Sequence, residues 1–109
     1  MQHLFPLPCA HCNQPWAHIQ NGCILIDSRH GGQTHTNTIA LPRLHLLLSM
    51  SLQQEVQPLT CRFDGCGRPW GIIQKGRLFC YVWHSREAHQ NTLSVTSLAM
   101  LISGVEATV

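Results

Sequence analysis

The chain contains the same sequence pattern twice, and this duplication is the feature that most constrains its fold. From Cys12 to Ser49, 13 of 38 positions hold the same residue as the position 54 residues later, without a gap. A repeat of this kind predicts two supersecondary units that fold alike and pack on one another. We therefore expect a first repeat over residues 1–51, a linker over residues 52–58 and a second repeat over residues 59–109.

Each unit is small for an independent domain. About 50 residues rarely bury enough apolar surface to offset the chain entropy of folding, so metals, disulfides or a partner usually stabilise such units. Apolar residues make up 44% of the chain and charged residues 11%, a composition that excludes a disordered tail. The sequence therefore predicts either close packing of the two copies or a stabilising metal or cross-link in each.

Cysteine and histidine supply a metal-ligand pattern that both copies share. Each copy has two nearby cysteines, then 17 other residues, then a His-x4-His pair. Two thiolates and two imidazoles fit a tetrahedral zinc with no open position. We expect each copy to close around its own ion, so that the chain holds two Zn²⁺. The expected ligands are Cys9, Cys12, His30 and His35 in the first copy, and Cys61, Cys66, His84 and His89 in the second.

Two further cysteines do not recur. Cys23 aligns with Arg77, and Cys80 aligns with Ile26. A duplicated disulfide framework would duplicate its partners, so zinc is favoured over three disulfides. Cys23 or Cys80 could replace a ligand, but we expect each to be a small buried hydrophobe.

Local signals predict a hairpin and a helix in each copy. Asn21-Gly22 and Lys75-Gly76 each separate two β-prone runs, as in a two-residue hairpin. The helices are expected to begin near Pro42 and to be capped by Thr96 or Ser97. Both are apolar nearly all round, so we expect them to pack between copies related by a pseudo-twofold axis. Because Gly31-Gly32 disfavours a helix, the histidines are expected at the strand-to-helix junction.

Two tryptophans recur soon after the cysteines. Trp16 and Trp70 are expected to cover the metal sites and form a small core. Trp83 aligns with Arg29 instead and is freer to serve a surface.

The order of these elements resembles the treble-clef class of zinc modules, in which a Cys-x2-Cys knuckle and a hairpin precede two ligands near a helix. The resemblance covers most of each repeat. It implies a small, zinc-stabilised α+β fold of two tandem pseudo-symmetric repeats, each a zinc knuckle, a β-hairpin and a short helix. Treble-clef modules host many activities, so the resemblance constrains structure more than function.

Basic residues are concentrated in the second copy. From Leu59 to Val95 there are five basic residues against two acidic ones, a net charge of +3. We therefore expect a non-enzymatic protein that binds nucleic acid or a nucleoprotein complex mainly through this copy. The expected contacts are Arg62, Arg68, Lys75, Arg77, Trp83 and Arg86.

An adaptor role is the first alternative. The apolar helices, or a β-edge, could instead contact a protein partner or a second copy of the chain. The helix residues concerned are Leu44, Leu46, Leu47, Leu48, Leu98, Met100, Leu101 and Ile102.

A degenerate HNH-like nuclease is the second alternative. The stretch from Asp27 to Asn37 resembles part of that motif, with His30 or His35 as general base. The second copy breaks the motif, because Tyr81 replaces Asp27. A histidine that binds structural zinc also cannot take a proton, so the sequence favours a protein without enzymatic activity.

The beginning of the chain lacks the features of a secretory signal, and no run approaches 18 apolar residues. We expect a cytoplasmic, intracellular protein with no membrane partner.

Overall fold

Each repeat folds into a four-stranded antiparallel sheet followed by one helix. The computed structural model describes residues 5–30, 32–63, 65–84 and 86–107. The first repeat contains β1 (Phe5–Pro8), β2 (Pro15–Gln20), β3 (Cys23–His30), β4 (Gln33–Ala40) and α1 (Leu41–Met50). The second contains β5 (Leu59–Thr60), β6 (Pro69–Gln74), β7 (Arg77–His84), β8 (Glu87–Ser94) and α2 (Val95–Ala107). Strands neighbour one another in chain order within both sheets, so the expected small α+β class is confirmed.

The two-residue hairpin turns form where the sequence predicts them. Asn21 and Gly22 connect β2 to β3 with φ angles of 57° and 72°. Lys75 and Gly76 connect β6 to β7 with φ angles of 51° and 76°. Positive φ at both central positions matches the twist of the flanking strands, which explains the choice of Asn-Gly and Lys-Gly.

A second and longer hairpin follows in each repeat, which the sequence reading missed. β3 pairs with β4 from Cys23–Ala40 to His30–Gln33, and β7 pairs with β8 in the same register. We call β3–β4 the first ribbon and β7–β8 the second ribbon. The histidines therefore lie at or near the ribbon tips, far from the helices, and the expected strand-to-helix location is wrong. The physical reason is the alternation along β4, where buried His35, Asn37 and Ile39 separate exposed threonines.

The helices begin directly where the ribbons end. α1 starts at Leu41 with Pro42 in its first turn, as predicted. The expected cap at Thr96 or Ser97 is wrong, because α2 already begins at Val95 and Ser94 Oγ accepts a hydrogen bond from the Ser97 amide at 3.1 Å.

The first amide of each helix is also held by the preceding hairpin turn. The Leu41 amide donates to the Gly22 carbonyl at 2.9 Å, and the Val95 amide donates to the Gly76 carbonyl at 2.8 Å. Each helix therefore starts beside the turn of its own sheet.

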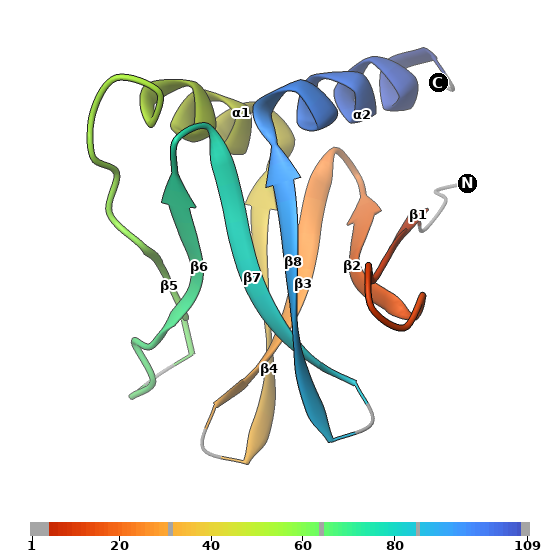
Figure 1. Cartoon of the computed structure of the whole chain (residues 1–109), viewed down its shortest axis with the longest axis vertical. Coiled ribbons are helices and arrows are strands. Elements are labelled where there is room, and N and C mark those ends of the chain that lie inside the picture. The colour runs from red at the N-terminus through yellow and green to blue at the C-terminus, as the bar shows by residue number, and fades with distance from the viewer. Residues whose placement is uncertain (1–4, 31, 64, 85, 108–109) are drawn as a thin grey trace.

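The two helices lie together at one end of the molecule, and the ribbons extend to the other (Figure 1). β3 and β7 contact each other between the sheets. The helices do contact each other as expected, but they cap one end and do not separate the copies, because the crossing ribbons occupy that place. Neither helix, over its described length, is long and apolar enough to cross a membrane.

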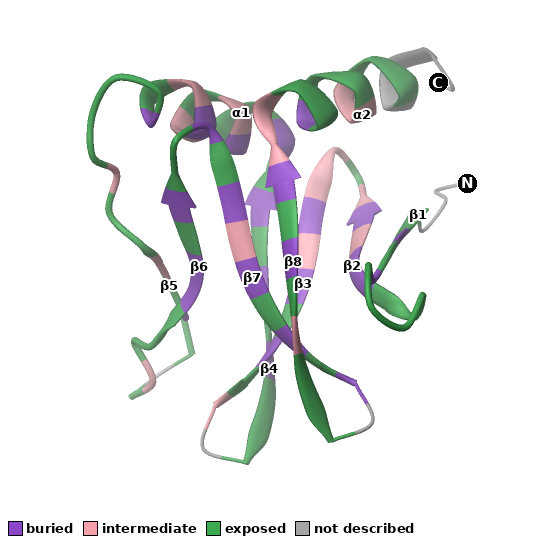
Figure 2. Cartoon of the chain, in the orientation of Figure 1, coloured by how far each residue is buried: buried purple, intermediate pink, exposed green. Residues whose placement is uncertain are grey.

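The core lies between the sheets and under the helices (Figure 2). Its fully enclosed side chains alternate along the ribbons and follow the inner faces of the helices; they are Ile24, Ile26, Leu78, Cys80, Leu41, Leu44, Leu48 and Leu98. Trp16 and Trp70 are 5% and 7% exposed and belong to this core, as expected.

We expect Leu98→Ala to lower the free energy of unfolding by about 2–5 kcal/mol, because truncating an enclosed leucine removes apolar contact and leaves a cavity. Met100→Ala on the same helix is the matched control, since Met100 is 71% exposed, and we expect a change within about 0.5 kcal/mol. Chemical denaturation at a fixed zinc concentration measures both. Equal losses in the two variants would contradict this core assignment.

Candidate metal centres

The eight cysteine and histidine residues that the copies share meet in two groups, and each group draws on both repeats. Centre 1 consists of Cys9, Cys12, His84 and His89, and centre 2 consists of His30, His35, Cys61 and Cys66. The expectation that each copy closes around its own ion is therefore wrong. The physical reason is that both histidines of a ribbon lie on the face that packs against the other repeat.

Tight turns present the cysteines. In the first knuckle, residues 9–14, the Cys9 amide donates to the Gln14 carbonyl at 2.7 Å and the Asn13 amide donates to the Cys9 carbonyl at 2.9 Å. Asn13 has a φ angle of 66°, and Gly67 at the equivalent position has 64°. Both knuckles therefore bend through the left-handed region, which asparagine and glycine tolerate best.

The second knuckle, residues 61–68, accommodates two more residues between its cysteines. The Cys61 amide donates to the Arg68 carbonyl at 2.7 Å, which matches the closing bond of the first knuckle. The Cys66 amide donates to the Phe63 carbonyl at 3.0 Å. The longer Cys-x4-Cys spacing is thus absorbed inside the loop, and both cysteines still face one centre.

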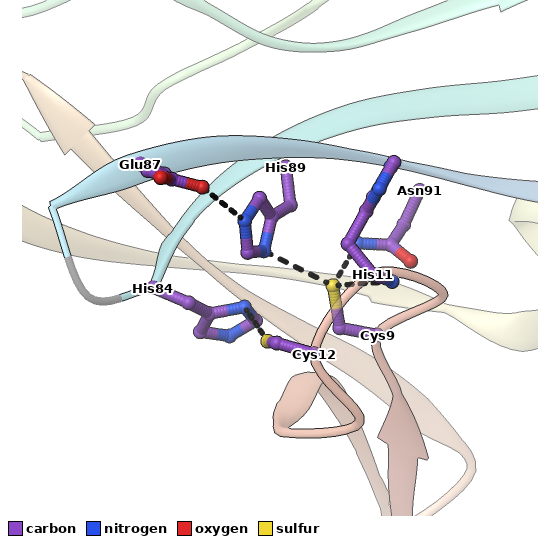
Figure 3. Close-up of polar contacts among 7 residues, drawn as sticks. All are labelled: Cys9, His11, Cys12, His84, Glu87, His89 and Asn91. Atoms are coloured by element: carbon purple, nitrogen blue, oxygen red, sulfur yellow. Dashed lines mark hydrogen bonds and ion pairs between the residues drawn. The ribbon is translucent and has the colours of Figure 1, made fainter.

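The distances within each centre match the edges of a tetrahedron around a metal ion (Figure 3). Cys12 Sγ lies 3.2 Å from His84 Nδ1, and Cys9 Sγ lies 3.5 Å from His89 Nδ1. In centre 2 the corresponding distances are 3.2 Å for Cys66–His30 and 3.3 Å for Cys61–His35. Zinc bonds to sulfur and nitrogen at tetrahedral angles would separate these atoms by about 3.5 Å. All four donor atoms of each group lie within 4.8 Å of one another.

Hydrogen bonds at the far side of the rings direct Nδ1 toward the centres. His84 Nε2 lies 2.9 Å from the Pro15 carbonyl, and His89 Nε2 lies 3.2 Å from Glu87 Oε2. These oxygens only accept, so Nε2 carries the proton in both rings. The Nδ1 lone pair is then free for a metal, as in the carboxylate–histidine–metal arrangement.

The two centres differ at one such contact. His89 donates to the Glu87 carboxylate, whereas Gln33 Oε1 at the equivalent position lies 3.3 Å from His35 Nε2. The Glu87 hydrogen bond raises the pKa of His89 above its usual value, against the opposing effect of burial. A more basic imidazole is a stronger metal donor, so centre 1 has the stronger nitrogen ligand.

One buried asparagine in each ribbon attaches that ribbon to the knuckle of the other repeat. Asn91 Oδ1 accepts from the Ala10 amide at 2.9 Å, and Asn37 Oδ1 accepts from the Arg62 amide at 3.0 Å. Asn91 Nδ2 also donates to Cys9 Sγ at 3.3 Å. The sequence reading recorded both asparagines as repeated residues but did not assign them to the metal sites. The available signal was their constant position, two residues after the second histidine of each copy.

Hydrogen bonds to sulfur favour the thiolate form of the first cysteine in each knuckle. Burial raises the pKa of Cys9, but bonds from Asn91 and from backbone amides outweigh it and lower the pKa to about 5. Burial also raises the pKa of Cys61, but the neighbouring Asn37 side chain and the Phe63 backbone outweigh it and lower the pKa to about 6. Thiolates are the form that binds metal, so both knuckles are chemically prepared for an ion.

A ring also lies against the second histidine of each centre. Phe63 lies parallel to His35 with ring centroids 4.2 Å apart, and His11 lies 5.1 Å from His89. His11 and Phe63 both stand two residues after the first cysteine of their knuckles. His11 is an exposed residue that covers a ligand ring.

The other two cysteines lie outside both groups. Cys80 belongs to the core, where burial raises its thiol pKa to about 12. Cys23 is half-buried in β3. All six cysteines are free thiols in the structure, and the donor sets are complete without Cys23 and Cys80.

The residues of the HNH-like alternative are divided between the two faces of the first ribbon. Asp27 is exposed on the outer face of β3, where it accepts a hydrogen bond from Thr36 Oγ1 at 2.6 Å. His30 and His35 belong to centre 2, and Asn37 binds the second knuckle. The proposed base and its supporting carboxylate therefore lie on different faces of the ribbon.

The expected nucleic-acid contacts are all exposed, but they do not gather in one patch. Arg62 and Arg68 belong to the second knuckle, Lys75 and Arg77 lie at the β6–β7 turn, and Arg86 lies at the tip of the second ribbon. β7 alone separates its two ends by about 23 Å. Arg77 and Trp83 share the outer face of β7, on which Trp83 is 50% exposed.

Comparison of the chain with protein-family models, with curated proteins and with solved structures finds no significant match.

Double variants test the cross-repeat ligand sets. Cys12→Ser with His84→Ala removes two ligands from centre 1 alone, so we expect this protein to retain one Zn²⁺ per chain. Cys12→Ser with His30→Ala removes one ligand from each centre, so we expect no ion to survive a chelator that leaves two on the wild type. Metal analysis after chelator competition measures both. The reverse result would support ligation within each repeat.

Exchanging Glu87 and Gln33, the hydrogen-bond partners of His89 and His35, tests whether the two centres differ in metal affinity. We expect Glu87→Gln to lower the zinc affinity of centre 1 about 10-fold, because outer hydrogen-bond partners strengthen ligating histidines. The matched variant Gln33→Glu should raise the affinity of centre 2. Competition with a chromophoric chelator resolves the two binding steps. Unchanged steps in both variants would show that these contacts do not affect the metal.

Proposed function

We propose that this chain is a non-enzymatic protein with two structural Zn²⁺ sites that binds nucleic acid, alone or within a nucleoprotein complex, through its second repeat. The donor sets support zinc, because two thiolates and two imidazoles in a tetrahedral arrangement fit this ion best. Four protein donors leave no open position for a substrate or an activated water. The ions therefore serve to hold the ribbon tips against the knuckles.

The outer face of the second sheet is the observation that supports nucleic-acid binding. Arg77, Phe79, Tyr81 and Trp83 alternate along β7 on this face, and Tyr81 and Trp83 are 57% and 50% exposed. An open antiparallel sheet with exposed aromatic rings offers a stacking surface for unpaired bases.

The residues that pair with this aromatic row carry no negative charge that would repel a nucleic acid. The residues paired with this row on β6 and β8 are Ile72, Gln74, Ala88, Gln90, Thr92 and Ser94, none of them acidic. Exposed arginines and a lysine at the edges of the same repeat are available for phosphates. The equivalent row on β3 of the first sheet is Leu25, Asp27 and Arg29, without an aromatic ring, so the second repeat is the better stacking surface.

Exposed apolar side chains on the helices favour the adaptor role as a second function. Leu46 on α1 is 58% exposed and Met100 on α2 is 71% exposed. Leu44, Leu48 and Leu98 are enclosed in the core, so most of the apolar helix surface stabilises the fold itself. Purification of partners with wild-type protein and a Leu46→Lys, Met100→Lys variant tests this role, which fails if both proteins retain the same partners.

We expect a labelled single-stranded oligonucleotide to bind the zinc-loaded protein at low salt, with affinity that falls as salt rises, because phosphate contacts release counterions. Charge reversal by Arg77→Glu and Arg86→Glu should weaken binding and reduce the salt dependence. Arg43→Glu on α1 is the matched control, since Arg43 is exposed in the first repeat. Fluorescence anisotropy measures all three. The proposal fails if the wild type does not bind at low salt, or if the charge-reversed protein binds like the control.

A further inference from the structure

The crossing of β3 and β7 creates two clefts that are equivalent in position but different in chemistry. One cleft, of about 210 Å³, is lined by Arg29 and by Trp70, Ile72, Phe79, Tyr81 and Trp83. We call it the aromatic cleft. The other, of about 230 Å³, is lined by Trp16, Arg29 and Trp83 and differs from the first in having His18, Leu25 and Asp27 where the first has Ile72, Phe79 and Tyr81. We call it the polar cleft.

The repeat explains how the two clefts correspond. His18, Leu25 and Asp27 of the polar cleft occupy the positions of Ile72, Phe79 and Tyr81 in the aromatic cleft, 54 residues earlier. Arg29 and Trp83 are likewise equivalent, and both line both clefts because they stand where the ribbons cross. The same backbone arrangement has therefore produced one aromatic and one polar cleft.

The aromatic cleft combines three features that suit a base attached to a phosphate. Tyr81 and Trp83 present exposed rings on the outer face of β7, and Phe79 is half-buried beside them. Arg29 is exposed on β3 and places a permanent positive charge at the same cleft. Ser28, whose buried hydroxyl has no hydrogen-bond partner in the described part of the chain, lines this cleft and the polar cleft alike.

Size and polarity limit the occupant. Pockets for drug-sized ligands span about 300–1,000 Å³, so a cleft of about 210 Å³ suits a single ring system. A flat ring attached to a phosphate can stack on the exposed aromatic side chains and pair with Arg29, whereas an aliphatic side chain makes neither contact. Bases inside a duplex are already stacked and cannot enter, so the occupant must come from a single strand.

We propose that the aromatic cleft binds one unpaired base of a single-stranded nucleic acid, stacked against Tyr81 or Trp83, with its backbone phosphate on Arg29. This inference rests on the proposed nucleic-acid function and makes it more specific. All nucleic-acid contacts expected from the sequence lie in the second repeat. At this cleft, however, the phosphate contact comes from Arg29 of the first repeat. Stacking tolerates any base, so the cleft selects for single strands more than for sequence.

Variants of exposed cleft residues test the inference. We expect Tyr81→Ala and Trp83→Ala each to weaken binding of an oligothymidylate by about 5- to 150-fold, the range for loss of one base–aromatic stack. Arg29→Gln should lower the slope of log affinity against log salt by about 0.7, the value for one phosphate contact on a single strand. Asp27→Asn is the matched control, because Asp27 holds the position of Tyr81 in the polar cleft. Zinc content verifies that every variant is folded.

Two further probes separate base binding from phosphate binding. An oligonucleotide with abasic sites keeps its phosphates, and we expect the wild type to bind it as weakly as Tyr81→Ala binds the intact strand. A duplex of the same length should also bind more weakly than the single strand.

The outcomes distinguish this inference from the proposed function. The inference is overturned, and the proposed function stands, if intact strands bind through Arg77 and Arg86 while Tyr81→Ala, Trp83→Ala and Arg29→Gln behave like Asp27→Asn. Equal affinity for the abasic strand would also overturn the inference alone. If no oligonucleotide binds at low salt, both fail.

Discussion

The reciprocal exchange of ligands between the repeats is the interaction on which the rest of the structure depends. Cys12 and His84 are 72 residues apart, and Cys9 and His89 are 80 residues apart. Neither centre can assemble from one repeat, so metal binding requires both repeats to be folded and crossed. A structural zinc site provides roughly 10–16 kcal/mol of apparent free energy, which is enough to offset a large part of the ordering cost of such small units. Ions bound at these centres would therefore stabilise the packing between the repeats as much as the knuckles themselves.

The sequence could predict the ligands but not their partners. Duplication separates the eight recurring residues from Cys23, Cys80 and the remaining histidines, but the same spacing of 17 residues occurs in both copies, so it fits either pairing. Chain entropy does not decide between them. The loop closed between Cys12 and His84 is four times as long as the loop between Cys12 and His30. The longer loop adds only about 1.2 kcal/mol to the entropic cost of loop closure. The decision comes from side-chain direction, because His30 lies on the face of β3 that packs against the other repeat.

Other parts of the fold were predictable to different degrees. The turns at Asn21-Gly22 and Lys75-Gly76 have a strong local signal, since positive φ is required there. The first ribbon also has a hairpin signature, Gly31-Gly32 between the paired His30 and Gln33, but the second copy has Ser85-Arg86 there, so the signal does not recur and in the sequence analysis it served only as evidence against a helix. Missing that second hairpin placed the histidines beside the helices. The role of Asn37 and Asn91 could not be predicted either, because each accepts a hydrogen bond from a knuckle of the other repeat.

The crossing also connects the metal centres to the surface. Arg29 immediately precedes His30, and Trp83 immediately precedes His84, so a ligand of each centre fixes the backbone beside one residue of the aromatic cleft. Pro15, whose carbonyl accepts from His84 Nε2, lines the polar cleft together with His84 itself. A partner bound across β3 and β7 would favour the crossed arrangement, and that arrangement is the one that holds both ions. By thermodynamic linkage, occupancy of the cleft and occupancy of the metal centres must then strengthen each other.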